Sequence, residues 1–115
     1  MRRFAIGFGV LVLFASVVGA AEPKPMRFWN LTSQTVVDFR AAPPGTGNWG
    51  ANQCANDRDG AVDHDERLRI TGVSPGRYDV KLTFKDGRVC TVRNIEMKDG
   101  GIFSIEDKDL TDCSK

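Results

Sequence analysis

The sequence predicts an all-β fold, a small antiparallel β-sandwich of about six or seven strands with an acidic loop between two of them. Several short stretches rich in aromatic and β-branched residues alternate apolar and polar side chains, which is the period of a half-buried strand. Clusters of glycine, proline, asparagine and aspartate separate these stretches, and no convincing helix follows the first twenty residues. A domain of this size has room for one modest core.

The first two expected strands cover Met26 to Thr32 and Thr35 to Ala41, because both stretches are rich in aromatic and β-branched residues. Ser33-Gln34 between them is short enough to be a turn. The run Pro43 to Asn48 then breaks any regular element.

Two further strands are expected after the acidic loop. Arg67 to Val73 alternates apolar and polar residues, and Ser74-Pro75-Gly76 then turns the chain. Arg77 to Lys85 alternates again, so an apolar face should lie opposite a polar one: Tyr78, Val80, Leu82 and Phe84 against Asp79, Lys81 and Thr83.

The segment Lys85-Asp86-Gly87 predicts a hairpin with a three-residue loop, since Gly87 suits the left-handed position after a type I turn. In that register Phe84 pairs with Arg88, and the next pairs place apolar beside apolar and acid beside base: Leu82 with Cys90, Val80 with Val92, Lys81 with Thr91 and Asp79 with Arg93. A two-residue loop would set apolar residues against polar ones. The segment Asp99-Gly100-Gly101 marks a further turn before a last strand over Ile102 to Ile105.

Residues 1–20 have the pattern of a secretory signal peptide. Arg2 and Arg3 form a basic start, an apolar run of fifteen residues covers Phe4 to Val18, and Val18-Gly19-Ala20 gives a small-x-small cleavage pattern. We therefore expect a single β-sandwich domain over residues 21–115, exported to the periplasm and not inserted in the membrane after cleavage. An uncleaved membrane anchor is the alternative.

Charge in this sequence is local. The chain has 16 Lys and Arg against 15 Asp and Glu, and two of the arginines belong to the expected signal peptide, so the mature net charge should be about −1. That balance gives no support for nucleic acid as a partner. The basic residues are scattered, whereas the acidic ones gather in one loop.

The three cysteines predict one disulfide in an oxidising compartment. A Cys90–Cys113 bridge would hold a polar C-terminal tail, and closing that loop would contribute about 3 kcal/mol in the chain-entropy model. Cys54 would then be a small buried hydrophobe. Pairing through Cys54 stays open, because sequence alone does not fix connectivity.

The acidic loop, Asn56 to Glu66, is the best indication of function. It holds five carboxylates and the only histidine of the chain, against one arginine, Arg58, so its charges repel one another unless they stay solvated or meet a cation. Setting Gly60 at the sixth position of an EF-hand loop fits several ligand positions, but the first position is Ala55 and the flanks have no helical period. We therefore expect a metal site of another kind, formed by residues of this loop: Asp57, Asp59, Asp63 and one of Asp65 and Glu66.

Other candidate residues have weaker support. His64 is a metal ligand or a solvated neighbour of the oxygen donors, and Trp49 is a packing residue or, close to a bound lanthanide, an optical antenna. Cys54 and His64 form the only conceivable nucleophile pair, and they lack a third residue or an oxyanion-binding motif. The sequence thus predicts neither catalytic residues nor an enzyme.

Several motifs resemble those of a group of small exported β-sandwich proteins of proteobacteria: Asn30-x-Thr32, Trp49-Gly50, Ile70-Thr71-Gly72, Tyr78-Asp79-Val80 and Asp86-Gly87. Within that group the acidic loop makes the chain similar to the landiscernin-like periplasmic lanthanide-binding proteins, over about residues 27 to 113. The resemblance implies that the loop binds a trivalent lanthanide ion.

Two hypotheses follow for the function. The first is a periplasmic protein that binds and carries lanthanide ions through the acidic loop, or calcium as the less selective version, with another periplasmic metal carrier as its partner. In this hypothesis the protein is a monomer without metal and forms a metal-bridged homodimer. The second is an envelope protein-interaction module without metal, whose acidic loop contacts a basic partner.

Overall fold

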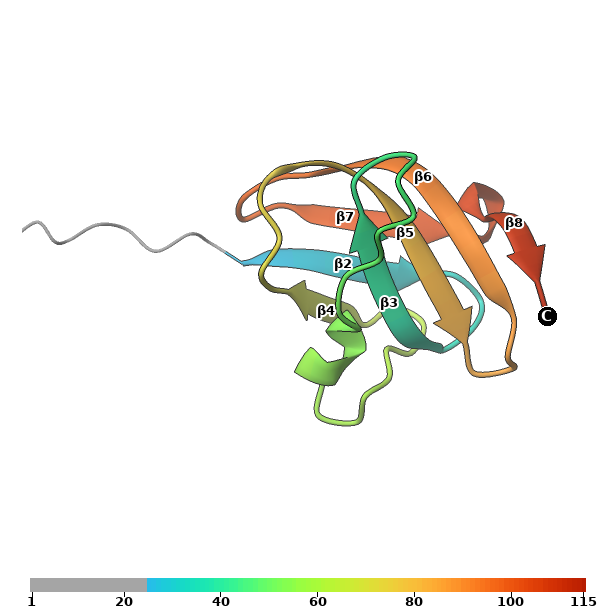
Figure 1. The fold of residues 1–115 in the computed structure, drawn as a ribbon. Coiled ribbons are helices and arrows are strands. Elements are labelled where there is room, and N and C mark those ends of the chain that lie inside the picture. Colours follow the sequence, from blue (N-terminus) through green and yellow to red (C-terminus); the bar gives the residue numbers. More distant parts are fainter. Residues whose placement is uncertain (1–24) are drawn as a thin grey trace, which may run out of the picture.

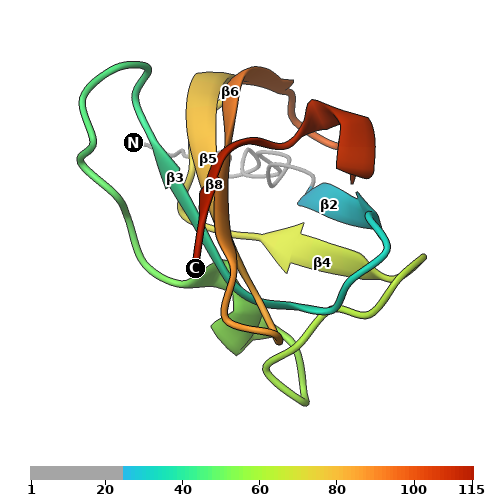
Figure 2. The same cartoon turned by 90° about the vertical axis from the view of Figure 1, so that its right-hand side faces the viewer.

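The computed structural model describes residues 25–115, which form a β-sandwich of two facing sheets (Figures 1 and 2). One sheet has three strands in the order β4-β2-β7 and the other has four in the order β3-β5-β6-β8. The strands are β2 (Met26–Leu31), β3 (Val36–Ala42), β4 (Arg67–Ile70), β5 (Gly76–Phe84), β6 (Val89–Met97), β7 (Ile102–Glu106) and β8 (Thr111–Ser114). The all-β sandwich predicted from the sequence is confirmed, while the expected signal peptide lies outside the described residues.

One pair of neighbouring strands is parallel, which the sequence did not predict. Strands β2 and β7 run in the same direction, with Arg27 beside Ile102 and Leu31 beside Glu106, whereas the other paired strands are antiparallel. Parallel neighbours need a crossover, and here the whole chain from β3 to β6 supplies it. No helix within residues 25–115 is long and apolar enough to span a membrane.

The core lies between the two sheets and is apolar. The rings of Phe28, Phe39 and Phe103 pack against one another with centroids 4.9 to 6.1 Å apart. Around them lie aliphatic side chains from both sheets, among them Val36, Leu68, Val80, Leu82 and Ile105, which are all at least 99% buried. Alternation along most strands sends these residues inward and their neighbours outward, whereas in β3 a register shift after Val36 places the next buried residue, Phe39, three positions later.

The β5–β6 hairpin confirms the three-residue loop. The Phe84 amide donates to the Arg88 carbonyl at 2.8 Å, and Gly87 has φ +93°. Leu82 pairs with Cys90, Val80 with Val92 and Lys81 with Thr91, as predicted.

Beyond Val80 the hairpin register shifts, and the predicted direct pairing of Asp79 with Arg93 is replaced by a β-bulge. Tyr78 pairs with Ile95, and Asn94 takes the extra position with φ +60°. The tyrosine hydroxyl donates to the Ser74 carbonyl at 2.7 Å. Asp79 was expected on the polar outer face, but it is only 5% exposed because the segment containing Gly45 covers it.

The segment before the acidic loop closes one side of the sandwich. It contains a 3-10 turn, η2 (Gln53–Asn56), whose side chains bond the outer edge of β4: Asn56 Nδ2 donates to the Arg69 carbonyl, and Gln53 bonds the backbone of Thr71 at both its N–H and its C=O. These contacts explain why β4 ends at Ile70 and not at Val73 as predicted. Asn52 Oδ1 accepts from the Phe39 amide on β3. One segment therefore covers the edge strand β4 of the three-stranded sheet and the edge strand β3 of the four-stranded sheet.

The C-terminal tail forms the short strand β8, which the sequence analysis did not predict. Its residues are all exposed, and a disulfide between Cys90 and Cys113 ties it to β6. Cys54 is free and fully buried. The predicted connectivity is therefore confirmed.

Candidate functional site

The acidic loop consists of two turns on either side of Val62. Val62 is 1% exposed and pairs with Val36 of β3 through two backbone hydrogen bonds of 2.8 and 2.9 Å. A buried valine thus fixes the middle of the loop to the four-stranded sheet, and the charged turns extend on both sides of it at the lower end of the sandwich in Figure 1.

The first turn carries Asp57 and Asp59. The Asp57 carbonyl accepts from the Gly60 amide at 3.1 Å, and Gly60 has φ +72°, a conformation that favours glycine. Asp57 Oδ2 accepts from the Asp59 amide at 3.0 Å, an Asx turn. Asp57 is half-buried, whereas Asp59 is exposed and its carboxylate accepts no hydrogen bond from residues 25–115.

The second turn carries Asp63, Asp65 and Glu66. The Glu66 amide donates to the Asp63 carbonyl at 3.0 Å, and the Asp63 amide donates to Glu66 Oε1 at 2.9 Å, so the turn is closed by both backbone and side chain. Asp65 has φ +72°, which aspartate tolerates better than most residues. Two backbone bonds to Asn30 fix this turn to β2.

Each carboxylate of the second turn is oriented by its own donor. Asp63 Oδ1 accepts from the Thr35 hydroxyl at 2.8 Å, and Asp65 Oδ1 accepts from the Trp29 indole N–H at 3.0 Å. The predicted convergence of four carboxylates on one ion is not present in this arrangement. Within residues 25–115 no three His, Cys, Asp or Glu side chains lie close enough together to hold a metal.

The charge of the loop is not neutralised by ion pairs. The ion pairs among residues 25–115 involve carboxylates elsewhere, namely Asp38, Asp79, Glu96 and Asp112. The nearest cation in sequence after the loop, Arg67, instead lies over the ring of Trp29, with its Cζ 4.4 Å from the centroid. Five carboxylates therefore stand in solvent contact without a paired cation in the described part of the chain.

His64 lies in the second turn with one nitrogen already engaged. Its Nδ1 is 2.8 Å from the Thr32 carbonyl oxygen. Because a carbonyl only accepts, Nδ1 is the donor of this hydrogen bond.

Two residues of the site were missed by the sequence analysis. Trp29, and not Trp49, is the tryptophan at the acidic loop, since Trp49 lies under Lys81 with Nζ 5.0 Å from its ring centroid. Asn30 is buried and bonds the loop from below, with Nδ2 donating to the Val62 carbonyl at 2.8 Å. The alternation of Met26 to Leu31 places Trp29 outward and Asn30 inward, but only tertiary structure brings either to residues more than thirty positions away.

Cys54, which the sequence analysis considered as a nucleophile beside His64 and set aside, lies in the core. Burial, followed by the charges of Asp38 and Asp57, raises the pKa of the Cys54 thiol to about 12. Its sulfur lies 3.8 Å from the Val36 carbonyl, inside the core. The thiolate that nucleophilic chemistry needs is therefore not formed at neutral pH.

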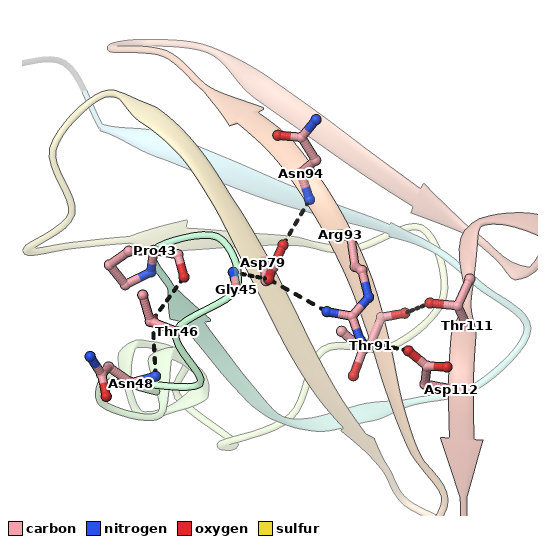
Figure 3. A network of polar contacts seen from close by, with 10 residues as sticks. All are labelled: Pro43, Gly45, Thr46, Asn48, Asp79, Thr91, Arg93, Asn94, Thr111 and Asp112. Carbon is pink, nitrogen blue, oxygen red and sulfur yellow. Dashed lines mark hydrogen bonds and ion pairs between the residues drawn. The ribbon is translucent and has the colours of Figure 1, made fainter.

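A second polar network, separate from the loop, surrounds Asp79 (Figure 3). The Gly45 amide and the Asn94 amide donate to its two carboxylate oxygens at 2.9 and 3.0 Å, and Arg93 lies 3.6 Å away. These backbone bonds, Gly45 first, and the positive charge of Arg93 lower the pKa of Asp79 despite its burial. Arg93 also bonds Asp112 of β8 at 2.7 Å, so the network ties three parts of the sheet together.

Comparisons with known proteins do not add to this geometry. No protein-family model, no curated protein and no solved structure matches the chain.

Proposed function

We propose that this protein binds a hard multivalent cation, a trivalent lanthanide with calcium as the weaker alternative, through the acidic loop. The ion is cargo in this proposal, and the protein carries it in the periplasm. The residues that supply oxygen donors are those expected from the sequence, and they divide between the two turns: Asp57 and Asp59 in the first, Asp63, Asp65 and Glu66 in the second.

One observation carries the proposal. In four of the five carboxylates one oxygen is held by a protein donor, while the other accepts no hydrogen bond from residues 25–115. These oriented and unneutralised oxygens are the ligands that calcium-like cations prefer. The mutual repulsion of five unpaired carboxylates is also the energy that a bound trivalent ion would relieve.

The carboxylates, as they are arranged among residues 25–115, do not enclose an ion. The second turn offers three of them within four residues, and all three are exposed, so rotation about their side-chain bonds is unobstructed by the core. Asp57 and Asp59 of the first turn reach an ion bound at the second turn only when the backbone on either side of Val62 bends toward that ion. A cation held chiefly by the second turn keeps water on its remaining coordination positions.

Terbium titration tests the proposal. Terbium bound at the second turn lies near Trp29, so excitation of tryptophan should sensitise its emission. Trp29→Phe should abolish that emission because it removes the sensitising indole, whereas Trp49→Phe should retain it. Micromolar lanthanum should also raise the thermal midpoint by several degrees, because a ligand that binds only the folded state adds about 2.7 kcal/mol at one hundred times its Kd. No thermal shift with lanthanum, terbium or calcium overturns the proposal.

A further inference from the structure

The outer face of the three-stranded sheet carries three arginines side by side. Alternation along β2 and β4 directs Arg27, Arg67 and Arg69 to solvent, and all three are exposed. We call Arg27, Arg67, Arg69 and the intervening Trp29 the arginine face. Its rows are fixed by strand register: Arg69, Arg27 and Ile102 in one row, then Arg67, Trp29 and Ser104 in the next.

Arg27 and Arg69 lie directly opposite one another on neighbouring strands. The backbone groups of both residues point away from the shared β2–β4 edge. The Arg27 amide donates to the Gly101 carbonyl next to β7, and the Arg69 carbonyl accepts from Asn56 at the outer edge of β4. Arg27 and Arg69 are therefore paired without backbone hydrogen bonds between them. In such pairs the Cα atoms are about 4.5 Å apart and the side chains are closest. Like charges directly opposite destabilise a sheet, and this pair therefore costs folding free energy.

No carboxylate of the described chain compensates that cost. None of the three arginines takes part in an ion pair or a side-chain hydrogen bond with residues 25–115, although the acidic loop reaches the arginine face, where Asp65 accepts from Trp29. Arg67 is held over the Trp29 ring, and Ile102 beside Arg27 is 51% exposed. Unpaired guanidinium groups beside an aromatic ring and an exposed aliphatic side chain have the composition of a protein-binding surface.

The geometry selects an acidic protein segment over an extended polyanion. Arg67 and Arg69 are two residues apart on one strand, about 6.7 Å, which is also the spacing of alternate side chains on an extended peptide. A membrane or a nucleic acid would place negative charge along the whole face and meet the repulsion of the acidic loop beside Trp29. A short segment that carries only a few carboxylates meets less of that repulsion.

We propose that the arginine face is a docking surface for an extended, carboxylate-rich protein segment, in which one acidic side chain bonds Arg69 and its cross-strand neighbour Arg27 and the next alternate acidic side chain bonds Arg67. The proposal goes beyond metal binding and rests on charge and register alone, so it is tested without metal. Arginine and carboxylate form paired, charge-assisted hydrogen bonds of defined geometry, which gives such a segment a fixed direction on the sheet.

The test is a titration of the purified protein, in a chelator and at low salt, with a fluorescein-labelled Glu-Ser-Glu-Ser-Glu peptide read by anisotropy. Binding should fall about fivefold for each of R27Q and R69Q, the equivalent of one exposed charge pair. R77Q on β5 is the control, since Arg77 is also an exposed strand arginine but lies in the other sheet. It should bind as the unmodified protein does.

A second readout separates docking from a structural role. Because Arg27 and Arg69 repel each other, R27Q should leave the thermal midpoint unchanged or raise it while weakening the peptide. The proposal is overturned if the peptide does not bind, if the Gln-Ser-Gln-Ser-Gln peptide binds equally well, or if R27Q and R69Q bind like R77Q. It is also overturned if phosphatidylglycerol vesicles capture the protein through the same arginines and the peptide does not compete.

Discussion

At the scale of single residues, Asn30 explains how a loop of repelling charges stays attached to a small sandwich. Its Nδ2 donates to the carbonyls of Gln34 and Val62, and its Oδ1 accepts from the amide and the hydroxyl of Thr32. All the hydrogen-bonding capacity of a fully buried amide is thereby used. The loop is held by neutral bonds from below, which leaves its carboxylates in solvent.

Removing single charges from the second turn should weaken metal binding without unfolding the protein. Asp63→Asn keeps the bond from Thr35 and loses one negative charge, so the Kd for lanthanum should rise about tenfold at unchanged circular dichroism. Asp57→Asn should act in the same direction.

Asp86→Asn is the control for these variants. Asp86 is an exposed carboxylate in the β5–β6 turn that likewise accepts a backbone amide, from Arg88 at 2.9 Å. Lanthanum affinity measured by calorimetry should not change for it. Equal losses for Asp86→Asn and Asp63→Asn would show that the loop is not the site and that the protein binds cations by overall charge.

Ionisation of Asp79 should make the free energy of unfolding depend on pH. Its pKa is lower in the folded protein than the ordinary value near 3.9, so the carboxylate stabilises the fold fully above that value, and the contribution is lost as the pH falls through the folded pKa. Asp79→Asn retains one acceptor oxygen for two backbone donors, and should cost about 1 to 3 kcal/mol at pH 7. Urea unfolding between pH 7 and pH 3 should show a smaller loss of stability in the variant than in the unmodified protein.

At the scale of elements, the sequence predicted what local patterns control. Alternation located the strands, and the need to match apolar and charged residues across the hairpin selected the three-residue loop before Arg88. It did not predict the bulge at Asn94 or the burial of Asp79, because the partners of Asp79, Gly45 and Asn94, are distant from it in sequence. The parallel β2–β7 pair was missed for the same reason, since its partners are separated by almost the entire domain.

The candidate site was predictable in composition but not in arrangement. Counting charges found all five carboxylates, yet their directions are set by Trp29, Thr35 and the Val36–Val62 bridge, which come from other strands. An EF-hand alignment assumes that one loop supplies one continuous turn. Here the buried Val62 divides it into two.

Strand β8 should depend on its disulfide. Apart from the Cys90–Cys113 bond, its attachment includes two register pairs with β6, the Thr111 hydroxyl bond to the Thr91 carbonyl and the exposed Arg93–Asp112 pair. Cys113→Ser should therefore lower the free energy of unfolding by about 3 kcal/mol, as expected for a closed loop with a sequence separation of 23. A reductant should destabilise the unmodified protein by a similar amount and leave Cys113→Ser unaffected in thermal melts, since Cys54 is already a free thiol. Equal melting of both proteins with and without reductant would contradict this role.

At the scale of the whole molecule, charge is separated along the three-stranded sheet. The arginine face occupies its β4–β2 side and continues directly into the acidic loop, where Trp29 bonds Asp65. A chain with nearly balanced charge thus presents two neighbouring surfaces of opposite charge. Approaching molecules are oriented by this separation and not by net charge.

The division of the acidic loop into two turns also bears on the number of protein copies per ion. Calcium takes six to eight oxygens, and trivalent ions of similar radius need at least as many. The second turn offers three carboxylates, so positions stay open for water or for the loop of a second copy, and the ion removes much of the repulsion between two such loops. We expect a monomer without metal and a dimer at half an equivalent of lanthanum that grows with protein concentration and is weaker for smaller lanthanides. Light scattering or sedimentation from tens to hundreds of micromolar protein measures it, with Asp63→Asn expected to shift the equilibrium toward monomer and Asp86→Asn to leave it unchanged. A monomer throughout that range would mean that water or the protein's own first turn completes the coordination, because only those ligands remain when a second copy is absent.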